Sequence, residues 1–405
     1  MTDWDSSMRQ MSAVEAFVTR AASRIDSAVA AIVRHQRWPL LVGILAVALS
    51  LIADTPDRSL FRDVGKQWYS DVLLRQIEHP LSPIDYETYR EIDAASGLGI
   101  LTHVDKTAFR ISIPLFGKIF HTGAASILIM NYVAGFLFFP MLVVVANRIF
   151  GDPIVAVYIT FAFALTWTGA HFFNDSFYGD GFAYFWLLAS IYFNRTGLVF
   201  ASVLIAAFTD ERALIGSAAA VFYFLGRARE VTRQDNTALV AISSVVAAWI
   251  AYFAIRGYMI FGLGFRTSIM TNNLHPQIVW FNIALGIPYA ALTVFQGLWI
   301  WLPIGLLALW LRRSIVETLG FAGLTILMLA VALAVWDFQR SLGYMLLLLP
   351  VAWQSAALSE RANRSISRSC FVLGLTLITP FNTVLRYLYA GPILTPPFYQ
   401  FEPAH

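Results

Sequence analysis

Cysteine and charged residues are both scarce in this sequence. The single cysteine, Cys370, can form neither an intramolecular disulfide nor a cysteine metal cluster. Charged residues make up 13% of the 405 residues and hydrophobic residues 58%, whereas a soluble domain has about 25% charged residues. No soluble core buries so much apolar surface, but an α-helix in a bilayer satisfies its own backbone hydrogen bonds and needs only apolar side chains. The composition therefore predicts an all-α, polytopic membrane protein.

Several motifs of soluble enzymes and nucleotide-binding proteins are also missing. The sequence has no P-loop, no GxGxxG after a strand and no HExxH motif. Its net charge is only +3, and Lys and Arg are scattered through short connections, so nucleic acid is not expected as a partner. Internal repeats, which are typical of many transporters, are absent as well.

Long apolar runs predict about eleven membrane-spanning helices. They are expected at residues 38–53, 124–146, 153–170, 177–193, 198–208, 213–225, 238–255, 291–311, 320–336, 342–358 and 370–389. The charged segment before Trp38 is too long for the n-region of a cleaved signal, so we interpret the first run as a retained signal anchor. The chain then divides into an N-terminal segment (1–37), a transmembrane domain (38–390) and a tail (391–405).

The distribution of arginine predicts the orientation, because Lys and Arg near the ends of spans favour the cytoplasmic side. With the N-terminal segment inside, the basic short loops that contain Arg148, Arg227 and Arg361 all fall on that side. The long loop 54–123, the acidic segment 171–181 and the C-terminal tail fall outside. We therefore expect an integral protein of a bacterial inner membrane, with a cytoplasmic N-terminus and an extracytosolic C-terminus.

Residues 198–225 are short for two spans and carry Asp210, Glu211 and Arg212 in their middle. One interrupted helix would place these charges near its centre, at a cost of about 2.5–3.5 kcal/mol each. It would also move basic clusters to the outer side. We therefore predict a hairpin of two short helices with the charged triplet at its outer tip.

The N-terminal segment and the first outer loop both contain amphipathic patterns. Apolar residues at helical spacing from Val14 to Ile32 predict a helix on the cytoplasmic membrane surface. Similar patterns at residues 68–74 and 109–120 predict interfacial helices within the long outer loop, and residues 278–289 are a further candidate.

Ionisable residues gather on the predicted outer face, where they are costly close to hydrocarbon and usually functional. They come from the long outer loop 54–123, the acidic outer segment 171–181, the hairpin tip 210–212 and the outer loop 337–341. These residues are Asp54, Asp57, Asp63, Lys66, Asp71, Arg110, His171, Asp175, Asp180, Asp210, Glu211, Arg212, Asp337 and Arg340. Carboxylates and arginines are therefore expected to converge on one face.

Short patterns on this face resemble the GT-C superfamily of integral-membrane glycosyltransferases, which use polyprenyl-phosphate sugars on the extracytosolic side. One is an acidic residue followed by aromatics in a large first outer loop, here Asp63, Trp68 and Tyr69. The others are the basic and apolar run 109–115, the charged junction 210–213, and Asp337 with Arg340 before the apolar run 344–350.

The resemblance implies a GT-C-like fold and transfer of a hexose or pentose from the carrier to a glycan, lipid or protein acceptor. Asp63 would be the general base, with Asp54 and Asp57 as alternatives. The donor phosphate would be bound by Arg340, Arg212 and Arg110. The sugar or the acceptor would contact the remaining acidic residues and a histidine: Asp175, Asp180, Glu211, Asp337 and His171. Direct attack would invert the anomeric centre.

The sequence departs from one branch of this superfamily. A tight Asp-x-Asp pair is missing from the first and second outer loops, which argues against the metal-dependent oligosaccharyltransferases. No cofactor is required by the sequence. A divalent metal at Asp63 with Asp175 or Asp180 stays open, since hard cations accept scattered carboxylates.

Other interpretations of the same residues also stay open. In a transporter or flippase, the arginines would bind the head group of an anionic lipid or glycan without chemistry. A noncatalytic assembly subunit is favoured if the outer carboxylates lie far apart. Locally, Asp63 could be a solvated loop residue, and Asp337 with Arg340 a surface ion pair worth under about 1 kcal/mol.

Overall fold

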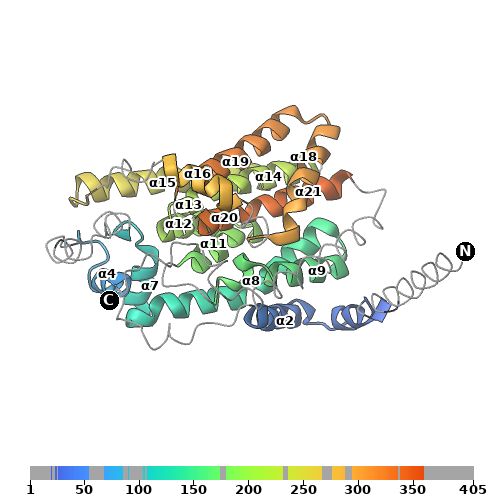
Figure 1. Cartoon of the computed structure of the whole chain (residues 1–405), viewed down its shortest axis with the longest axis horizontal. Coiled ribbons are helices and arrows are strands. Elements are labelled where there is room, and N and C mark those ends of the chain that lie inside the picture. Colours follow the sequence, from blue (N-terminus) through green and yellow to red (C-terminus); the bar gives the residue numbers. More distant parts are fainter. Residues whose placement is uncertain are drawn as a thin grey trace, which may run out of the picture.

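A computed structural model of the chain describes residues 20, 23–24, 26–53, 68–84, 90, 104, 107–173, 179–230, 236–266, 276–287, 294–335 and 338–359. This part of the chain is all-helical and contains no strand. Its helices form an elongated bundle with α4 and α7 at one end (Figure 1). The predicted span 370–389, the tail and most of the predicted N-terminal helix lie outside the described residues.

Long helices run back and forth along the bundle. They are α2 (Trp38–Ala53), α8 (Ser126–Phe150), α9 (Pro153–Ala164), α11 (Asp180–Tyr192), α12 (Thr196–Thr209), α14 (Ala218–Glu230), α15 (Thr237–Phe261), α18 (Trp301–Leu311), α19 (Ile315–Leu333) and α21 (Leu348–Ser359). Shorter elements connect them: α4 (Trp68–Glu78), α7 (Ser112–Phe120), α10 (Trp167–Ala170), α13 (Arg212–Gly216), α16 (Pro276–Phe281), α20 (Phe338–Gly343), the 3-10 helices η1 (Gly123–Ala125), η4 (Gln296–Ile300) and η5 (Tyr344–Leu347), and the π-helical η3 (Asn282–Gly286).

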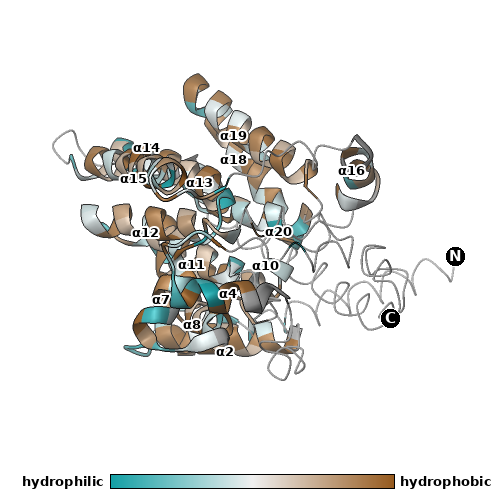
Figure 2. Cartoon of the chain, turned by 90° about the vertical axis from the view of Figure 1, so that its left-hand side faces the viewer, coloured by the Kyte–Doolittle hydropathy of each residue, from teal (hydrophilic) through white to brown (hydrophobic). Residues whose placement is uncertain are grey.

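A helix occupies each predicted span that falls within the described residues. Of these helices, Ser126–Phe150, Thr237–Phe261 and Ile315–Leu333 are long and apolar enough to cross a membrane. Seen end-on, the helices are mostly hydrophobic, and hydrophilic stretches gather around α4, α13 and α20 (Figure 2). The described part is therefore an all-helical membrane protein.

Local sequence explains how the first long helices begin, end and pack. The left-handed Gly151 (φ 61°) ends α8, and the Asp152 side chain then caps α9 by accepting hydrogen bonds from the backbone N–H groups of Ile154 and Val155. Gly43 brings α2 against α8, because a Cβ at this position would overlap the ring of Pro140. These contacts fix α2, α8 and α9 as one packed layer.

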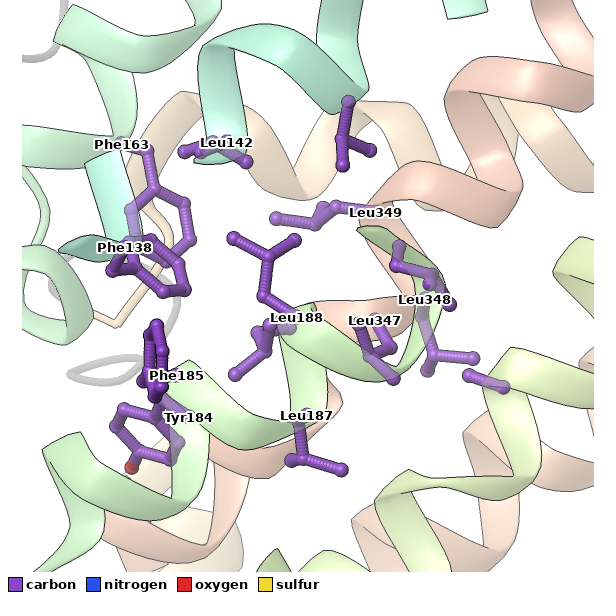
Figure 3. Close-up of a cluster of buried hydrophobic side chains, with 14 of the residues drawn as sticks. Phe138, Leu142, Phe163, Tyr184, Phe185, Leu187, Leu188, Leu347, Leu348 and Leu349 are labelled. Atoms are coloured by element: carbon purple, nitrogen blue, oxygen red, sulfur yellow. The ribbon is translucent and has the colours of Figure 1, made fainter. Parts of the chain in front are cut away.

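Helix α11 lies in the centre of the hydrophobic core and therefore has a fixed position. Leu187 and Leu188 of α11 are fully buried, and their neighbours come from α8, α9 and the η5–α21 segment (Figure 3). The surrounding side chains drawn there include Phe138, Leu142, Phe163, Leu347, Leu348 and Leu349. Because α11 begins at Asp180, this packing also fixes the position of that carboxylate.

The predicted hairpin at residues 198–225 is confirmed. Helix α12 ends at Thr209 and α14 ends at Glu230. Arg227 Nη1 of α14 donates a 2.7 Å hydrogen bond to Asn194 Oδ1, just before α12. The end of α14 therefore returns to the start of α12, and residues 210–212 lie at the turn.

Arginines of the predicted cytoplasmic loops meet at the opposite end of the bundle from this turn. Arg148 Nη1 donates to the carbonyl of Tyr192 at 2.6 Å. Arg229 Nη1 contacts Glu317 Oε2 at 2.8 Å and Ser314 Oγ at 2.7 Å. The basic loops and the hairpin tip therefore lie at opposite ends of the bundle, as predicted. Which end of the bundle faces the cytoplasm stays a prediction.

Helices are also present in the predicted outer segments. The long loop contains α4 and α7, and the segment before the eighth predicted span contains α16 followed by η3. Ser112 Oγ of α7 donates to the carbonyl of Ile205 in α12 at 2.9 Å. The loop therefore packs against the hairpin, and its position at a membrane interface stays a prediction.

Candidate functional site

Asp180 lies at the first position of α11 and is completely shielded from solvent (0% exposed). Gly179 precedes it in the left-handed conformation (φ 78°), which glycine adopts without strain. The backbone N–H of Phe182 donates to Asn131 Oδ1 of α8 at 2.9 Å and ties this end of α11 to its neighbour. The carboxylate is therefore held at a fixed point inside the bundle.

Four side chains from different segments surround the Asp180 carboxylate. Arg340 Nε donates to Oδ2 at 2.6 Å, and Arg212 Nη2 donates to Oδ1 at 3.2 Å. The Tyr344 hydroxyl donates to Oδ1 at 2.5 Å, and His171 Nε2 lies 3.4 Å from Oδ2. A carboxylate bound by two guanidiniums and a hydroxyl is fully satisfied although it has no contact with bulk water.

A second carboxylate, Asp210, binds the other side of Arg212. Its Oδ1 accepts from Arg212 Nε at 2.8 Å and from the Arg212 backbone N–H at 2.9 Å, and its Oδ2 lies 2.7 Å from Nη2. Asp210 ends α12 and Arg212 begins α13, and both side chains are largely shielded from solvent. Arg212 therefore joins Asp180 and Asp210 in one network.

Arg110 adds a cation from the long first outer loop. Its Nη2 lies 2.9 Å from Asp210 Oδ2, and its Nε lies 3.4 Å from Glu211 Oε2. Asp210 is completely buried, whereas the Glu211 side chain keeps 31% of its surface exposed. We refer to Arg110, Asp180, Asp210, Arg212 and Arg340 as the charged cluster.

The three arginines of this cluster exceed its two aspartates by one positive charge, and Glu211 beside Arg110 offsets it. Burial alone would raise the pKa of Asp210, but the guanidiniums of Arg110 and Arg212 outweigh it and hold that pKa below the ordinary value of 3.8. Asp210 is therefore ionised at neutral pH. Because desolvation opposes the attraction between buried ions, such a network is weak evidence for stability and more typical of function in a membrane protein.

Aromatic rings fix the orientation of the cluster. The Arg212 guanidinium lies 4.8 Å from the centre of the Tyr344 ring, within the range of a cation–π contact. The Tyr184 hydroxyl donates to the backbone carbonyl of Arg340 at 3.1 Å, and Trp167 stacks on His171 at 4.3 Å. These contacts hold both arginines and the histidine in defined positions.

A small hydrophobic cluster covers the Arg110 side of the site. It joins Phe109 of the outer loop to Phe208 at the end of α12 and to Tyr252 of α15. Arg256 of α15 lies 4.2 Å from the centre of the Phe109 ring, and Phe265 packs against the same ring at 5.6 Å. The loop segment that carries Arg110 is therefore anchored over the hairpin tip.

A shallow pocket of about 210 Å³, open mouth included, adjoins the charged cluster. Its polar side is formed by Arg212, Ser341 and Tyr344, and its apolar side by Ile215, Met328 and Val331. Arg212 Nη1 donates to Ser341 Oγ at 2.9 Å at this pocket. The site thus reaches the surface of the bundle beside α19.

The six predicted site residues that the structure describes all lie in one place. Arg110, Asp180, Arg212 and Arg340 belong to the charged cluster, while His171 and Glu211 contact it. The other predicted site residues lie outside the described residues: Asp54, Asp57, Asp63, Asp175 and Asp337. Their roles stay predictions.

Sequence reasoning missed Ser341 and Tyr344 as site residues. Both follow Arg340 closely, and the spacing of four residues between Arg340 and Tyr344 places them on the same face of a helix. This spacing could have identified Tyr344. No signal in the sequence indicated that Ser341 would contact Arg212.

A metal site was left open by the sequence. Among the described residues, no group of three or more His, Cys, Asp or Glu side chains could hold a metal ion. The candidate partners Asp63 and Asp175 lie outside that part of the chain. Asp180 is bound by two arginines instead.

Comparison with known proteins gives no relative. No protein-family model matches the chain, and neither a curated protein nor a solved structure does.

Proposed function

We propose that this protein is a GT-C-like membrane glycosyltransferase that moves a sugar from a polyprenyl-phosphate carrier to an extracytosolic glycan, lipid or protein acceptor. The observation that carries the proposal is the charged cluster, in which Arg110, Arg212 and Arg340 meet Asp180 and Asp210 inside an apolar bundle. Ionisable groups are expensive in such surroundings. Their convergence from separate segments supports binding of a charged substrate.

The arginines suit the chemistry of sugar transfer from a lipid phosphate. In an inverting transfer, the acceptor oxygen attacks the anomeric carbon, a base removes its proton, and the bond from that carbon to the phosphate oxygen breaks. The phosphate leaves with the electron pair, so cations fixed in advance stabilise the transition state. We assign Arg340 and Arg212 to the phosphate, with Arg110 beside them.

The contacts refine the roles of the acidic residues. Asp180 is fully buried and bound by two arginines and a tyrosine. It is therefore better suited to orienting the arginines than to contacting the sugar. Glu211, whose side chain is 31% exposed, remains suited to contact with sugar or acceptor hydroxyls.

The general base of the proposal is Asp63, with Asp54 and Asp57 as alternatives. All of them lie outside the described residues. The α7 and Arg110 segments of the same outer loop pack against the hairpin tip. This packing supports a loop that reaches the cluster and can deliver a carboxylate to it.

The proposal includes the finer topology. About eleven spans would form a GT-C-like fold, with interfacial helices of the first outer loop as a roof. The N-terminus would be cytoplasmic and the C-terminus extracytosolic in a bacterial inner membrane. The separation between the arginines at the far end of the bundle and the charged cluster supports this arrangement.

A transporter or flippase for an anionic lipid-linked or glycan substrate is the main alternative. It would use the same arginines to hold a head group. A noncatalytic assembly subunit loses its support within the described residues, because Asp180 and Asp210 share Arg212 and do not lie far apart.

The test is turnover of the carrier by the purified protein. Proteoliposomes that contain the full chain would be incubated with a panel of polyprenyl-phosphate sugars and with acceptors, and the released polyprenyl phosphate would be measured. We expect release with at least one sugar and none with Arg340→Ala. Movement of the intact lipid-linked sugar across the bilayer without release would contradict the transferase and support the flippase.

A further inference from the structure

The pocket beside the charged cluster combines a cationic floor with apolar walls. Arg212, Ser341 and Tyr344 form the polar side, and Ile215, Met328 and Val331 form the apolar side. The pocket encloses only about 10 Å³ and is open at its mouth, so an occupant would contact this lining and extend beyond it. A purely polar or purely apolar occupant would match only half of this lining.

The floor of the pocket still has hydrogen-bond donors to offer. Arg212 Nη1 donates to Ser341 Oγ at 2.9 Å, while Nε and Nη2 are bound to Asp210 and Asp180. Among the described residues, the second N–H of Nη1 has no acceptor, and the Ser341 hydroxyl hydrogen has none either. Both donors lie at the same contact. A phosphate oxygen could accept from both.

The α19 side of the pocket adjoins an exposed face of the bundle. Helices α14 and α19 touch farther along their seam, where a Cβ on Gly320 would lie 2.7 Å from the ring of Phe222. Toward the charged cluster, α13 takes the place of α14 beside α19, and the pocket lies there, with Met328 and Val331 on the α19 side. Ile326 and Leu327, which precede them on α19, are 66% and 50% exposed.

The exposed side chains of α19 indicate which environment surrounds the pocket. Helix α19 is one of the helices long and apolar enough to cross a membrane, and large apolar side chains are exposed along it, including Leu319 at 66%. A surface of this kind faces hydrocarbon in a membrane protein. An occupant of the pocket therefore arrives from the lipid phase.

We infer that the pocket between α13, α19 and α20 is a lateral binding site for a lipid phosphate, with the phosphate on Arg212 and Ser341 and the first part of the chain along Ile215, Met328 and Val331. The inference rests on the proposed function for the identity of the lipid as the sugar carrier. It adds Ser341 as a phosphate-binding residue and assigns the apolar side to the chain. The cationic Arg212 and the apolar side of the pocket are both used only by a phosphate that carries an alkyl chain.

The test compares three probes on the full-length protein in phosphatidylcholine nanodiscs. Dodecyl phosphate carries both parts of the lipid, dodecanol only the chain, and inorganic phosphate only the head. Binding is measured by native mass spectrometry or by competition with a radiolabelled probe. We expect dodecyl phosphate to bind at least about tenfold more tightly than either partial probe, since tenfold corresponds to about 1.4 kcal/mol.

Matched tryptophan variants of α19 locate the site. Val331→Trp fills the pocket and should weaken dodecyl phosphate binding by about tenfold or more, through loss of the chain contacts. Leu327→Trp places the same side chain on the exposed face and should change binding by less than about twofold. Equal binding by the two variants would overturn the inference.

Ser341→Ala tests the phosphate end of the site with a smaller change. It also serves as the test if the Val331→Trp variant does not fold. It should weaken dodecyl phosphate binding by about fivefold to tenfold, because a hydrogen bond to a charged group is lost, and leave dodecanol binding unchanged. Unchanged binding of dodecyl phosphate, or inorganic phosphate that binds as tightly, would remove the site. If the site is found but no sugar transfer occurs, the proposed function fails while the lipid phosphate site stands.

Discussion

Arg340 donates from Nε to Oδ2 of Asp180 at 2.6 Å, although the two residues are 160 positions apart in the chain. The arginine lies in α20 and the carboxylate begins α11. Arg212 of the hairpin reaches the other oxygen of the same carboxylate. Asp180 is thus the point where the hairpin and the late helices are held together, and its replacement should affect both arginines at once.

Asp180→Asn should lower the stability of the fold and the affinity for the donor. Removing the charge of Asp180 leaves the buried Arg212 and Arg340 with one anion fewer. The loss of one partner of a buried ion pair lowers the free energy of unfolding by about 3–5 kcal/mol. The free energy of unfolding would be measured by urea titration of the purified protein in detergent. Asp152→Asn, which changes the cap of α9 outside the cluster, is the matched control and should cost less than about 1 kcal/mol. Equal losses in the two variants would contradict the central role of Asp180.

Much of the helical layout could be predicted from the sequence, since apolar runs and arginine-rich turns are local signals. The hairpin with Asp210 and Arg212 at its turn followed from the cost of burying charge, and the structure contains it. The pairing of residues was beyond such reasoning. Nothing local shows that Arg110 would reach Asp210, or that Ser341 would reach Arg212, because these contacts depend on how distant helices pack.

Arg340→Lys should weaken donor binding while the fold persists. Nε of Arg340 donates to Asp180, and a planar guanidinium can bind a phosphate through two parallel hydrogen bonds, whereas an ammonium is a single point charge. Donor affinity would be measured with a radiolabelled polyprenyl-phosphate sugar, and a loss of about tenfold is expected. Arg148→Lys at the far end of the bundle keeps the charge and should bind the donor normally. Unchanged affinity in Arg340→Lys would remove Arg340 from the phosphate site.

The pairing of Asp210 predicts a loss of stability in acid. Burial raises the pKa of Asp210, but Arg110 and Arg212 lower it further, so the folded value lies below 3.8. Because the pKa of Asp210 is lower in the folded than in the unfolded state, the carboxylate stabilises the fold fully above the unfolded pKa of about 3.9. This stabilisation is lost as the pH falls through the folded pKa. Unfolding of the wild type and of Asp210→Asn would be compared between about pH 3 and pH 7. The difference in stability should be constant above about pH 5 and shrink below about pH 4; a difference that grows in acid would contradict the ion pair.

The two ends of the bundle should face opposite sides of the membrane. In a Cys370→Ser background, cysteines introduced by Arg361→Cys and by Ala404→Cys would be labelled with a membrane-impermeant maleimide on intact cells. Because basic loops favour the cytoplasm, we expect protection at position 361 and labelling at position 404. Arg229→Cys tests the basic end seen in the structure, where Arg229 contacts Glu317. Labelling of position 229 from outside would overturn the predicted orientation.

Asp63→Asn tests the chemical step, because it keeps the size of the side chain and removes the base. The loop that contains Asp63 continues into α4 and α7, and Arg110 before α7 binds Asp210, so a carboxylate from this loop has a route to the cluster. Partial desolvation there would raise a carboxylate pKa and improve it as a base. Turnover should fall by about 100-fold or more while donor binding and expression persist. Asp54→Asn and Asp57→Asn are the matched controls from the same loop. Full activity of Asp63→Asn together with loss in one of these controls would move the base to that residue. Full activity of every variant would contradict the transfer mechanism proposed here, which takes its base from these three aspartates.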